Sequence, residues 1–188
     1  SDLKKQLEAL VLDDHGFRSL ELALSAYCPF EALGMVNAEI RHSTFLASML
    51  DPYRPHGFGT AFMREFLYRL LGEGEQHPGL SRMRLHLADL ENADVRREWH
   101  HIDILLVLPD LRLVIALELK IGAGESQGQL KRYAEAIEIE WPSTGEAAWS
   151  HLFFFLTRDS DEATESHWRA IDYGLVISTV EQFLRKAP

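Results

Sequence analysis

The stretch from Glu98 to Lys120 reads EWHHIDILLVLPDLRLVIALELK, and it decides the fold. Within it, the runs Ile102 to Leu108 and Leu111 to Leu119 are rich in Val, Ile and Leu, which favour buried strands. The pair Pro109-Asp110 stands between the two runs and is a turn signal. The stretch therefore predicts a buried antiparallel hairpin.

Charged residues interrupt these apolar runs near the open end of the hairpin. Because side chains alternate along a strand, Glu118 and Lys120 point to one face while Leu119 points to the other. A turn at Pro109-Asp110 brings Asp103 level with this end. Charges on such apolar strands are costly unless they are paired or bind a metal, and a divalent cation would complete this set. The competing interpretation is an ordinary ion pair at a solvated strand end.

Four ordered motifs resemble a known group of enzymes. Asp103 followed by Glu118-Leu119-Lys120 resembles the D...E-x-K signature of the PD-(D/E)xK nuclease superfamily, and Gln129 to Tyr133 resembles the Q-x-x-x-Y motif of its exonuclease and recombination branch. The run Phe30 to Leu71 is similar to a bacterial family of that superfamily. The motifs that carry this last likeness are Asn37-Ala38-Glu39, Arg41-His42-Ser43, Asp51-Pro52 and His56-Gly57. Leu119 departs from the pattern, which often has Asn there, but it faces away from the site.

The resemblance implies an α/β fold of the restriction-endonuclease type, with a mixed central sheet flanked by helices and an N-terminal helical segment. We expect a single domain over residues 1–188, helical over 1–72 and sheet-containing over 83–188. The implied activity is metal-dependent hydrolysis of phosphodiester bonds, with nucleic acid as the partner and DNA as the expected substrate.

The resemblance also implies roles for individual residues. The expected catalytic residues are Asp103, Glu118, Lys120 and Gln129. The expected ligands of Mg²⁺ or Mn²⁺ are Glu39, Asp103, Glu118 and the carbonyl oxygen of Leu119. The expected substrate-binding residues are Tyr133, His42 and Arg97.

Simpler roles compete with several of these. Glu39 would also suit a carboxylate that complements the helix dipole. His42 would also suit a hydrogen bond within the core, and Tyr133 a contact that seats its helix. Arg97 is one of several arginines that would equally suit exposed positions; the others are Arg82, Arg84 and Arg96.

Further elements follow from periodicity and breakers. The expected helices are Asp2–Asp13, Ser19–Tyr27, Asn37–Leu50, Ala61–Leu71, about Glu125–Glu140, and Thr179–Lys186 with Thr179 as its cap. Besides the hairpin, the expected strands are Met83–Leu87 at a sheet edge, Val95–His101, a strand from His151, and Leu175–Ser178.

Composition limits the class of protein. The length of 188 residues suits one domain with a core of its own. The single cysteine, Cys28, excludes an intramolecular disulfide and a Cys-rich zinc site, which fits a reducing cytoplasm. Neither a signal peptide nor a membrane span is visible. The net charge of -10 argues against a broad basic surface for nucleic acid, although bound cations would offset the carboxylates of the site.

Two other functions fit the same residues. The first is a non-catalytic binding or regulatory module on the same fold, in a bacterial defence or toxin assembly. The second is a hydrolase of smaller phosphate esters, which would use the same metal chemistry. The motifs carry no code for base preference or for DNA against RNA, and a start without Met leaves open whether the chain is a piece of a longer protein.

Overall fold

The computed structural model describes residues 4, 14–16, 39–72, 80–121, 126 and 128–186. The chain divides into two compact units, Ser1–Val36 and Asn37–Pro188, and the fold below is that of the second. The helices expected at Asp2–Asp13 and Ser19–Tyr27, apart from Lys4, and also Cys28 lie outside the described residues. The expectation of one domain over the whole chain stays a prediction.

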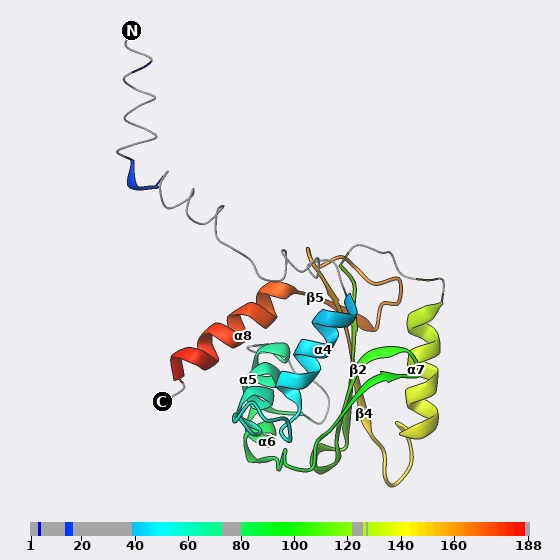
Figure 1. Cartoon of the computed structure of the whole chain (residues 1–188). Helices are drawn as coiled ribbons and strands as arrows, with labels where there is room; N and C mark the ends of the chain where they lie inside the picture. The colour runs from blue at the N-terminus through cyan, green and yellow to red at the C-terminus, as the bar shows by residue number, and fades with distance from the viewer. Residues whose placement is uncertain are drawn as a thin grey trace. The chain divides into compact units, whose positions relative to one another are not determined.

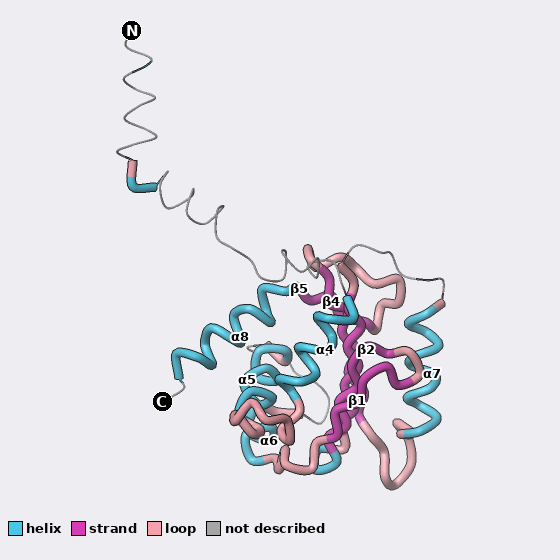
Figure 2. The backbone as a smooth tube through the Cα atoms, viewed as in Figure 1, coloured by secondary structure: helices cyan, strands magenta, loops and turns pink. Residues whose placement is uncertain are grey.

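A five-stranded mixed sheet forms the centre of this unit, in the order β1-β2-β3-β4-β5 (Figures 1 and 2). The first three strands are antiparallel neighbours, while β4 lies parallel to β3 and β5 parallel to β4. This mixed sheet confirms the predicted fold class. The strands are β1 (Asp94–Trp99), β2 (Ile102–Leu108), β3 (Leu113–Leu119), β4 (Ser150–Thr157) and β5 (Trp168–Asp172).

Helices cover both faces of the sheet (Figure 1). One face packs against four helices, and the other packs against α7 alone among the described elements. The helices are α4 (Glu39–Leu50), α5 (Ala61–Leu70), α6 (Arg82–Leu87), α7 (Gln129–Glu140) and α8 (Tyr173–Lys186).

Alternation along β2 and β3 builds the two cores. Ile104 and Leu117 are paired in the register and belong to the core under α4, α5, α6 and α8. Leu105 and Ala116, each one residue away, are also paired but belong to the core under α7. Both strands are almost wholly buried, which explains why they read as continuous apolar runs in the sequence.

The predicted hairpin is confirmed, with a turn that differs in detail. Pro109–Leu111 forms a short 3-10 helix, so that β3 begins at Leu113 rather than at Leu111. Arg112 ends the turn in the left-handed conformation, with a φ of 47°. Its backbone N–H donates to the carbonyl of Pro109 and closes the turn.

The expected edge strand Met83–Leu87 is wrong, because α6 occupies this segment. The side chain of Ser81 caps the helix by accepting a hydrogen bond from the backbone N–H of Arg84 at 3.1 Å. Only Leu85 of this helix is buried, while Met83 and Leu87 are exposed. The apparent alternation of apolar residues therefore did not reflect a strand with one buried face.

The end of the chain also differs from expectation. The expected strand Leu175–Ser178 lies within α8, and the strand beside β4 is instead β5, which the sequence did not predict. Thr179 is not a helix cap: it is fully buried within α8, and its hydroxyl donates to the carbonyl of Leu175 at 2.7 Å. A short apolar run fits the period of a strand and the period of a helix equally well, and here the packing of α8 against α5 favours the helix.

Among the described residues, no helix combines the length and the apolar character that crossing a membrane requires.

Candidate active site

Two carboxylates meet on neighbouring strands at one end of the sheet. The pairing of Ile104 with Leu117 places Asp103 on β2 level with Glu118 on β3, as the hairpin predicts. The backbone N–H of Leu119 donates to Oδ2 of Asp103 at 2.7 Å and holds the first carboxylate in place. Glu118 is only 2% exposed, so an ionisable group lies inside the sheet-helix interface.

Lys120 supplies the positive charge of this cluster. Its Nζ lies 3.1 Å from Oε1 of Glu118 and 3.7 Å from Oε2 of Glu39. The backbone N–H of Lys120 donates to the carbonyl of Leu156 on β4, which fixes the chain as it leaves β3. Glu39 reaches the cluster from the start of α4, and its Oε1 accepts the backbone N–H of Ile121 at 2.8 Å.

The low polarity of the surroundings raises the pKa of both strand carboxyls. Burial, with the charge of Asp103 added, raises the pKa of Glu118 to about 7. Burial likewise raises the pKa of Asp103 to about 6, although the N–H of Leu119 and the charge of Lys120 act against it. For Lys120, burial acts to lower the pKa, but the nearby carboxylates outweigh it and hold the pKa above its usual value. Lys120 is therefore an ammonium, suited to offset negative charge.

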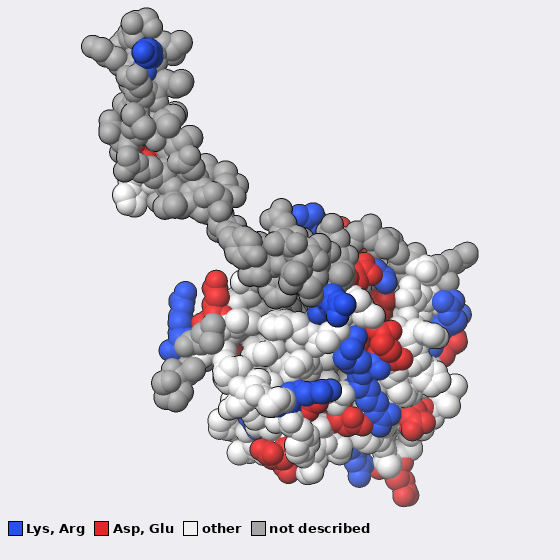
Figure 3. Space-filling model, viewed as in Figure 1, with Lys and Arg blue, Asp and Glu red and all other residues white. Residues whose placement is uncertain are grey.

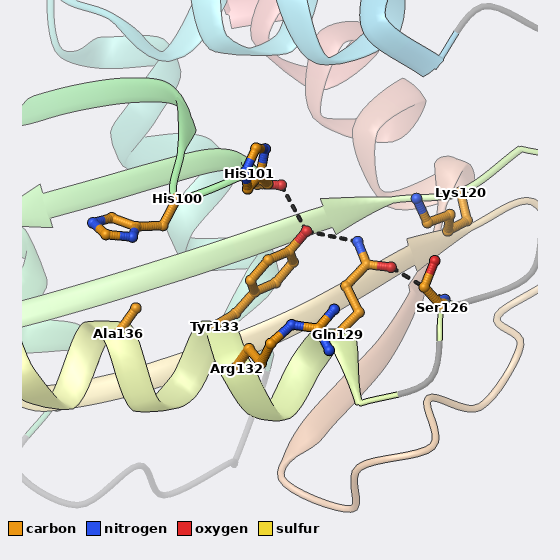
Figure 4. A pocket seen from close by; sticks show the side chains of 8 residues that line it. All are labelled: His100, His101, Lys120, Ser126, Gln129, Arg132, Tyr133 and Ala136. Carbon is orange, nitrogen blue, oxygen red and sulfur yellow. Dashed lines mark hydrogen bonds between the residues drawn. The ribbon is translucent and has the colours of Figure 1, made fainter.

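Helix α7 holds the carboxylate of Glu118 through Gln129, whose contact with Tyr133 is drawn in Figure 4. Its Nε2 donates to Oε1 of Glu118 at 2.7 Å and to the hydroxyl of Tyr133 at 2.6 Å. The hydroxyl of Tyr133 in turn donates to the carbonyl of His101 at 2.7 Å. One i, i+4 pair on α7 thus ties the site to the turn between β1 and β2.

A match over most of the chain accompanies this geometry. The family model described as the PD-(D/E)XK nuclease superfamily matches residues 29–187. The chain belongs to this superfamily. Its members are nucleases as a group. Searches of the curated proteins and of the solved structures found no significant match.

The two strand carboxyls of this superfamily member suit a divalent cation. Oε2 of Glu118 is buried and has no hydrogen-bond partner, which is costly unless a ligand completes it. Mg²⁺ is commonly bound by one or two carboxylates, with water and substrate phosphate in the remaining positions, and Asp103 with Glu118 fits this pattern. Among the described residues, no group of three or more His, Cys, Asp and Glu side chains lies close enough together to hold a metal ion.

The other two expected ligands take different positions. Glu39 is engaged by Lys120 and by the N–H of Ile121, so direct coordination would require it to leave the lysine. Leu119 is buried in the core, and its N–H supports Asp103. The carbonyl of Leu119 as a metal ligand stays a prediction.

The three residues expected to bind substrate do not all lie near the carboxylates of the site. Tyr133 is buried, at 5% exposure, and its hydroxyl seats α7 against the turn, which favours the simpler of its two expected roles. His42 packs edge-on against the ring of Tyr173, with 5.5 Å between centroids. Arg97 is paired with Ile104, whose side chain faces α4 and α5, so it lies on the opposite face of the sheet from Asp103. Arg97 lines a small pocket there with residues of α4.

Sequence reasoning missed Tyr173, which stands directly after β5 at the start of α8. Its hydroxyl is buried and has no hydrogen-bond partner. Burial, with the charges of Glu39 and Asp103 added, raises the pKa of Tyr173 to about 12, so the phenol stays protonated beside the carboxylates. A correct prediction of β5 would have placed Tyr173 at the same sheet end as Lys120, because β5 lies parallel to β4 and β3.

Proposed function

We propose that the protein is a metal-dependent nuclease that hydrolyses phosphodiester bonds of nucleic acid, with DNA as the expected substrate. The observation that carries this proposal is the pair of carboxyls, a half-buried Asp103 and a buried Glu118, with Nζ of Lys120 3.1 Å from Glu118 and an unpartnered oxygen on Glu118. Membership of the nuclease superfamily supports the same chemistry.

Asp103 and Glu118 would hold Mg²⁺ or Mn²⁺ at the end of the sheet. A divalent cation supplies positive charge that polarises a scissile phosphate and makes nearby water more acidic. The raised pKa of each carboxyl fits this role, because a cation bound there would replace the protons that burial favours. Glu39 would serve as a third ligand once Lys120 turns from it toward the substrate.

The chain's own groups would position and stabilise the reacting phosphate. The ammonium of Lys120 would offset the charge on the phosphate oxygens and orient the attacking water. Gln129 would keep Oε1 of Glu118 in place, so that Oε2 faces the cation. The proposed contacts to the rest of the substrate remain His42, Tyr133 and Arg97. Arg97 could make such a contact only with nucleic acid that extends to the other face of the sheet.

The overall charge requires that attraction of nucleic acid be local. Lys and Arg side chains lie among Asp and Glu side chains on the face shown in Figure 3, and the net charge of the chain is -10. A substrate polyanion would therefore depend on the bound cations and on the basic groups beside the site rather than on a general field.

The proposal is tested by Mn²⁺ calorimetry together with nuclease assays. Wild type should bind Mn²⁺ saturably, and Asp103→Asn, which retains an acceptor for the N–H of Leu119, should lose that binding. Lys120→Ala should lose cleavage of single- and double-stranded DNA while its circular dichroism stays that of wild type. Lys131→Ala, at an exposed position of α7, is the control for loss of a charge. Turnover by Lys120→Ala equal to wild type would contradict the assignment.

A second candidate is a non-catalytic module on the same fold. The pairing of Glu39 with Lys120 favours it, since this ion pair gives the lysine and Glu39 a partner without a metal. Absence of Mn²⁺ binding at millimolar concentration, with DNA left intact, would support this candidate over the nuclease.

A further inference from the structure

A pocket of about 480 Å³ opens beside the carboxylate site, between α7 and the turn that joins β1 to β2 (Figure 4). Gln129, Tyr133 and Ala136 lie at helical spacing on the face of α7 that forms one wall. The turn forms the other wall. The described lining residues are His100, His101, Lys120, Ser126, Gln129, Arg132, Tyr133 and Ala136.

The lining is basic, in contrast to the chain as a whole. Arg132 and Lys120, the latter paired with Glu118 and Glu39 behind it, contribute positive charge, and the turn contributes two imidazoles, while the described lining includes no Asp or Glu. The net charge of the whole chain is -10, so this composition is a local feature. Such a lining suits an anionic ligand that extends from the carboxylate site.

The two imidazoles stand on a turn of unfavourable backbone geometry. Trp99 pairs with Ile102, so His100 and His101 form a two-residue loop, with φ values of 48° and 71°. Two-residue hairpin loops with positive φ at both positions strongly favour Asn-Gly, and positive φ is uncommon for residues other than glycine. The expected continuation of β1 through His101 is therefore wrong, since the strand ends at Trp99. The hydrogen bond from Tyr133 to the carbonyl of His101 holds this turn against α7.

An exposed aromatic ring lines the pocket, backed by two tryptophans. The exposed ring of His100 lies 4.3 Å from the ring of Trp99, at 63° between planes. Trp99 is half-buried and lies 5.2 Å from Trp141, the C-cap of α7, which is buried in the core and supports Trp99 from below. Proteins that bind single strands combine positively charged grooves with aromatic rings on which bases stack. The basic lining of the pocket and the exposed ring of His100 supply these two features here.

The size of the pocket suits a single unpaired nucleotide better than a base pair within a duplex. Its volume of about 480 Å³ lies in the range of roughly 300–1,000 Å³ that holds small ligands. One nucleotide fits such a space, whereas a base that remains paired within a duplex cannot enter a pocket without leaving the stack.

We propose that this pocket binds one unpaired nucleotide adjacent to the scissile phosphate, so that the protein prefers single-stranded nucleic acid. His100 provides a ring for the base, Arg132 contacts a backbone phosphate, and Lys120 connects the pocket to the carboxylates. The assignment rests on the proposed nuclease function for its place beside the scissile phosphate. The preference for an unpaired strand can be measured by binding alone.

The first test is fluorescence anisotropy of a labelled ten-nucleotide oligo-dT and of its duplex with oligo-dA, in EDTA so that no metal-dependent cleavage occurs. Wild type should bind the single strand at least about tenfold more tightly than the duplex. The double substitution His100→Asn with His101→Gly supplies the residues that the turn prefers, so the fold is retained while both rings are lost. It should weaken single-strand binding about tenfold.

A charge variant tests the phosphate contact. Arg132→Gln should weaken single-strand binding and lower the slope of log affinity against log salt by about 0.7, the value for one phosphate contact on a single strand. Lys131→Gln removes a charge from the adjacent exposed position, which is not among the residues lining the pocket, and it should leave that slope unchanged. Equal affinity for duplex and single strand, or unchanged affinity in the double histidine variant, would overturn the proposal.

A small diester separates the two proposals. Bis(p-nitrophenyl) phosphate needs the carboxylate site but no nucleotide pocket. Metal-dependent hydrolysis of this diester, lost in Asp103→Asn, together with equal binding of duplex and single strand, would refute the pocket and retain the nuclease. Histidine-dependent single-strand preference without hydrolysis of the diester or of any DNA would retain the pocket and refute the nuclease.

Discussion

Replacing Glu118 by Gln should change how the stability of the metal-free protein depends on pH. The carboxyl of Glu118 has a pKa of about 7 in the folded chain, against an ordinary value of 4.5. Between these two pH values the folded state keeps a proton that the unfolded state has lost, so stability falls as pH rises through this window and stays low above it. One pKa unit corresponds to about 1.4 kcal/mol, which makes the difference on the order of 3 kcal/mol.

Gln at this position avoids the ionisation and keeps the local contacts. Its Oε1 would still accept from Gln129 and Lys120, and its amide would take the place of the unpartnered Oε2. Glu118→Gln should therefore be more stable than wild type at pH 8 in EDTA by about 3 kcal/mol, and close to wild type near pH 4.5.

Urea denaturation followed by circular dichroism at pH 4.5 and pH 8 in EDTA measures this difference. Glu135→Gln, at an exposed position of α7, controls for the loss of one negative charge. Replacement of EDTA by Mn²⁺ at pH 8 should then stabilise wild type and leave Glu118→Gln unaffected, because only a folded site that binds the ion gains stability by mass action. Lower stability of Glu118→Gln than wild type at pH 8 would refute the argument.

Three further substitutions test the surroundings of the site. Tyr173→Phe removes a buried hydroxyl without a partner, so the thermal unfolding midpoint of the variant should equal or exceed that of wild type. Its DNA turnover should fall at least about tenfold, and unchanged turnover would count against a role of Tyr173 in the site. Gln129→Leu removes the support of Glu118 and should lower turnover about 10- to 100-fold in the same assay, with wild-type rates as the contradicting result. Leu117→Ala opens a cavity in a fully buried position and should cost about 2–5 kcal/mol in urea denaturation, and a loss well under 1 kcal/mol would contradict the packing described.

The central hairpin was predictable because its information is local. Continuous apolar runs identify strands buried on both faces, and a proline-containing turn between them sets the antiparallel register within a residue or two. That register alone places Asp103 beside Glu118. The Gln129 and Tyr133 pair was predictable for a similar reason, since i, i+4 spacing on a helix guarantees one face.

Short segments of mixed pattern were not predictable in this way. The segment Met83–Leu87 alternates as a strand does, yet a serine cap and one buried leucine make it α6. The segment Leu175–Ser178 suits a strand or a helix, and the position beside β4 went to β5 instead. In both cases a few residues fit the strand period and the helix period equally well, and tertiary packing determined which of the two formed.

By itself, the sequence determined the buried hairpin, the two carboxylates and the lysine at its end, and the polar face of α7, because each depends on neighbours within a strand, a turn or a helix. Only the tertiary structure decided that Glu39 reaches Ile121, 82 residues away, and that Tyr173 points its hydroxyl toward the same site. It also decided that the His100-His101 turn and Arg132 enclose one pocket. These contacts join segments that are far apart in the sequence, and they form only when those segments pack, which no local period encodes.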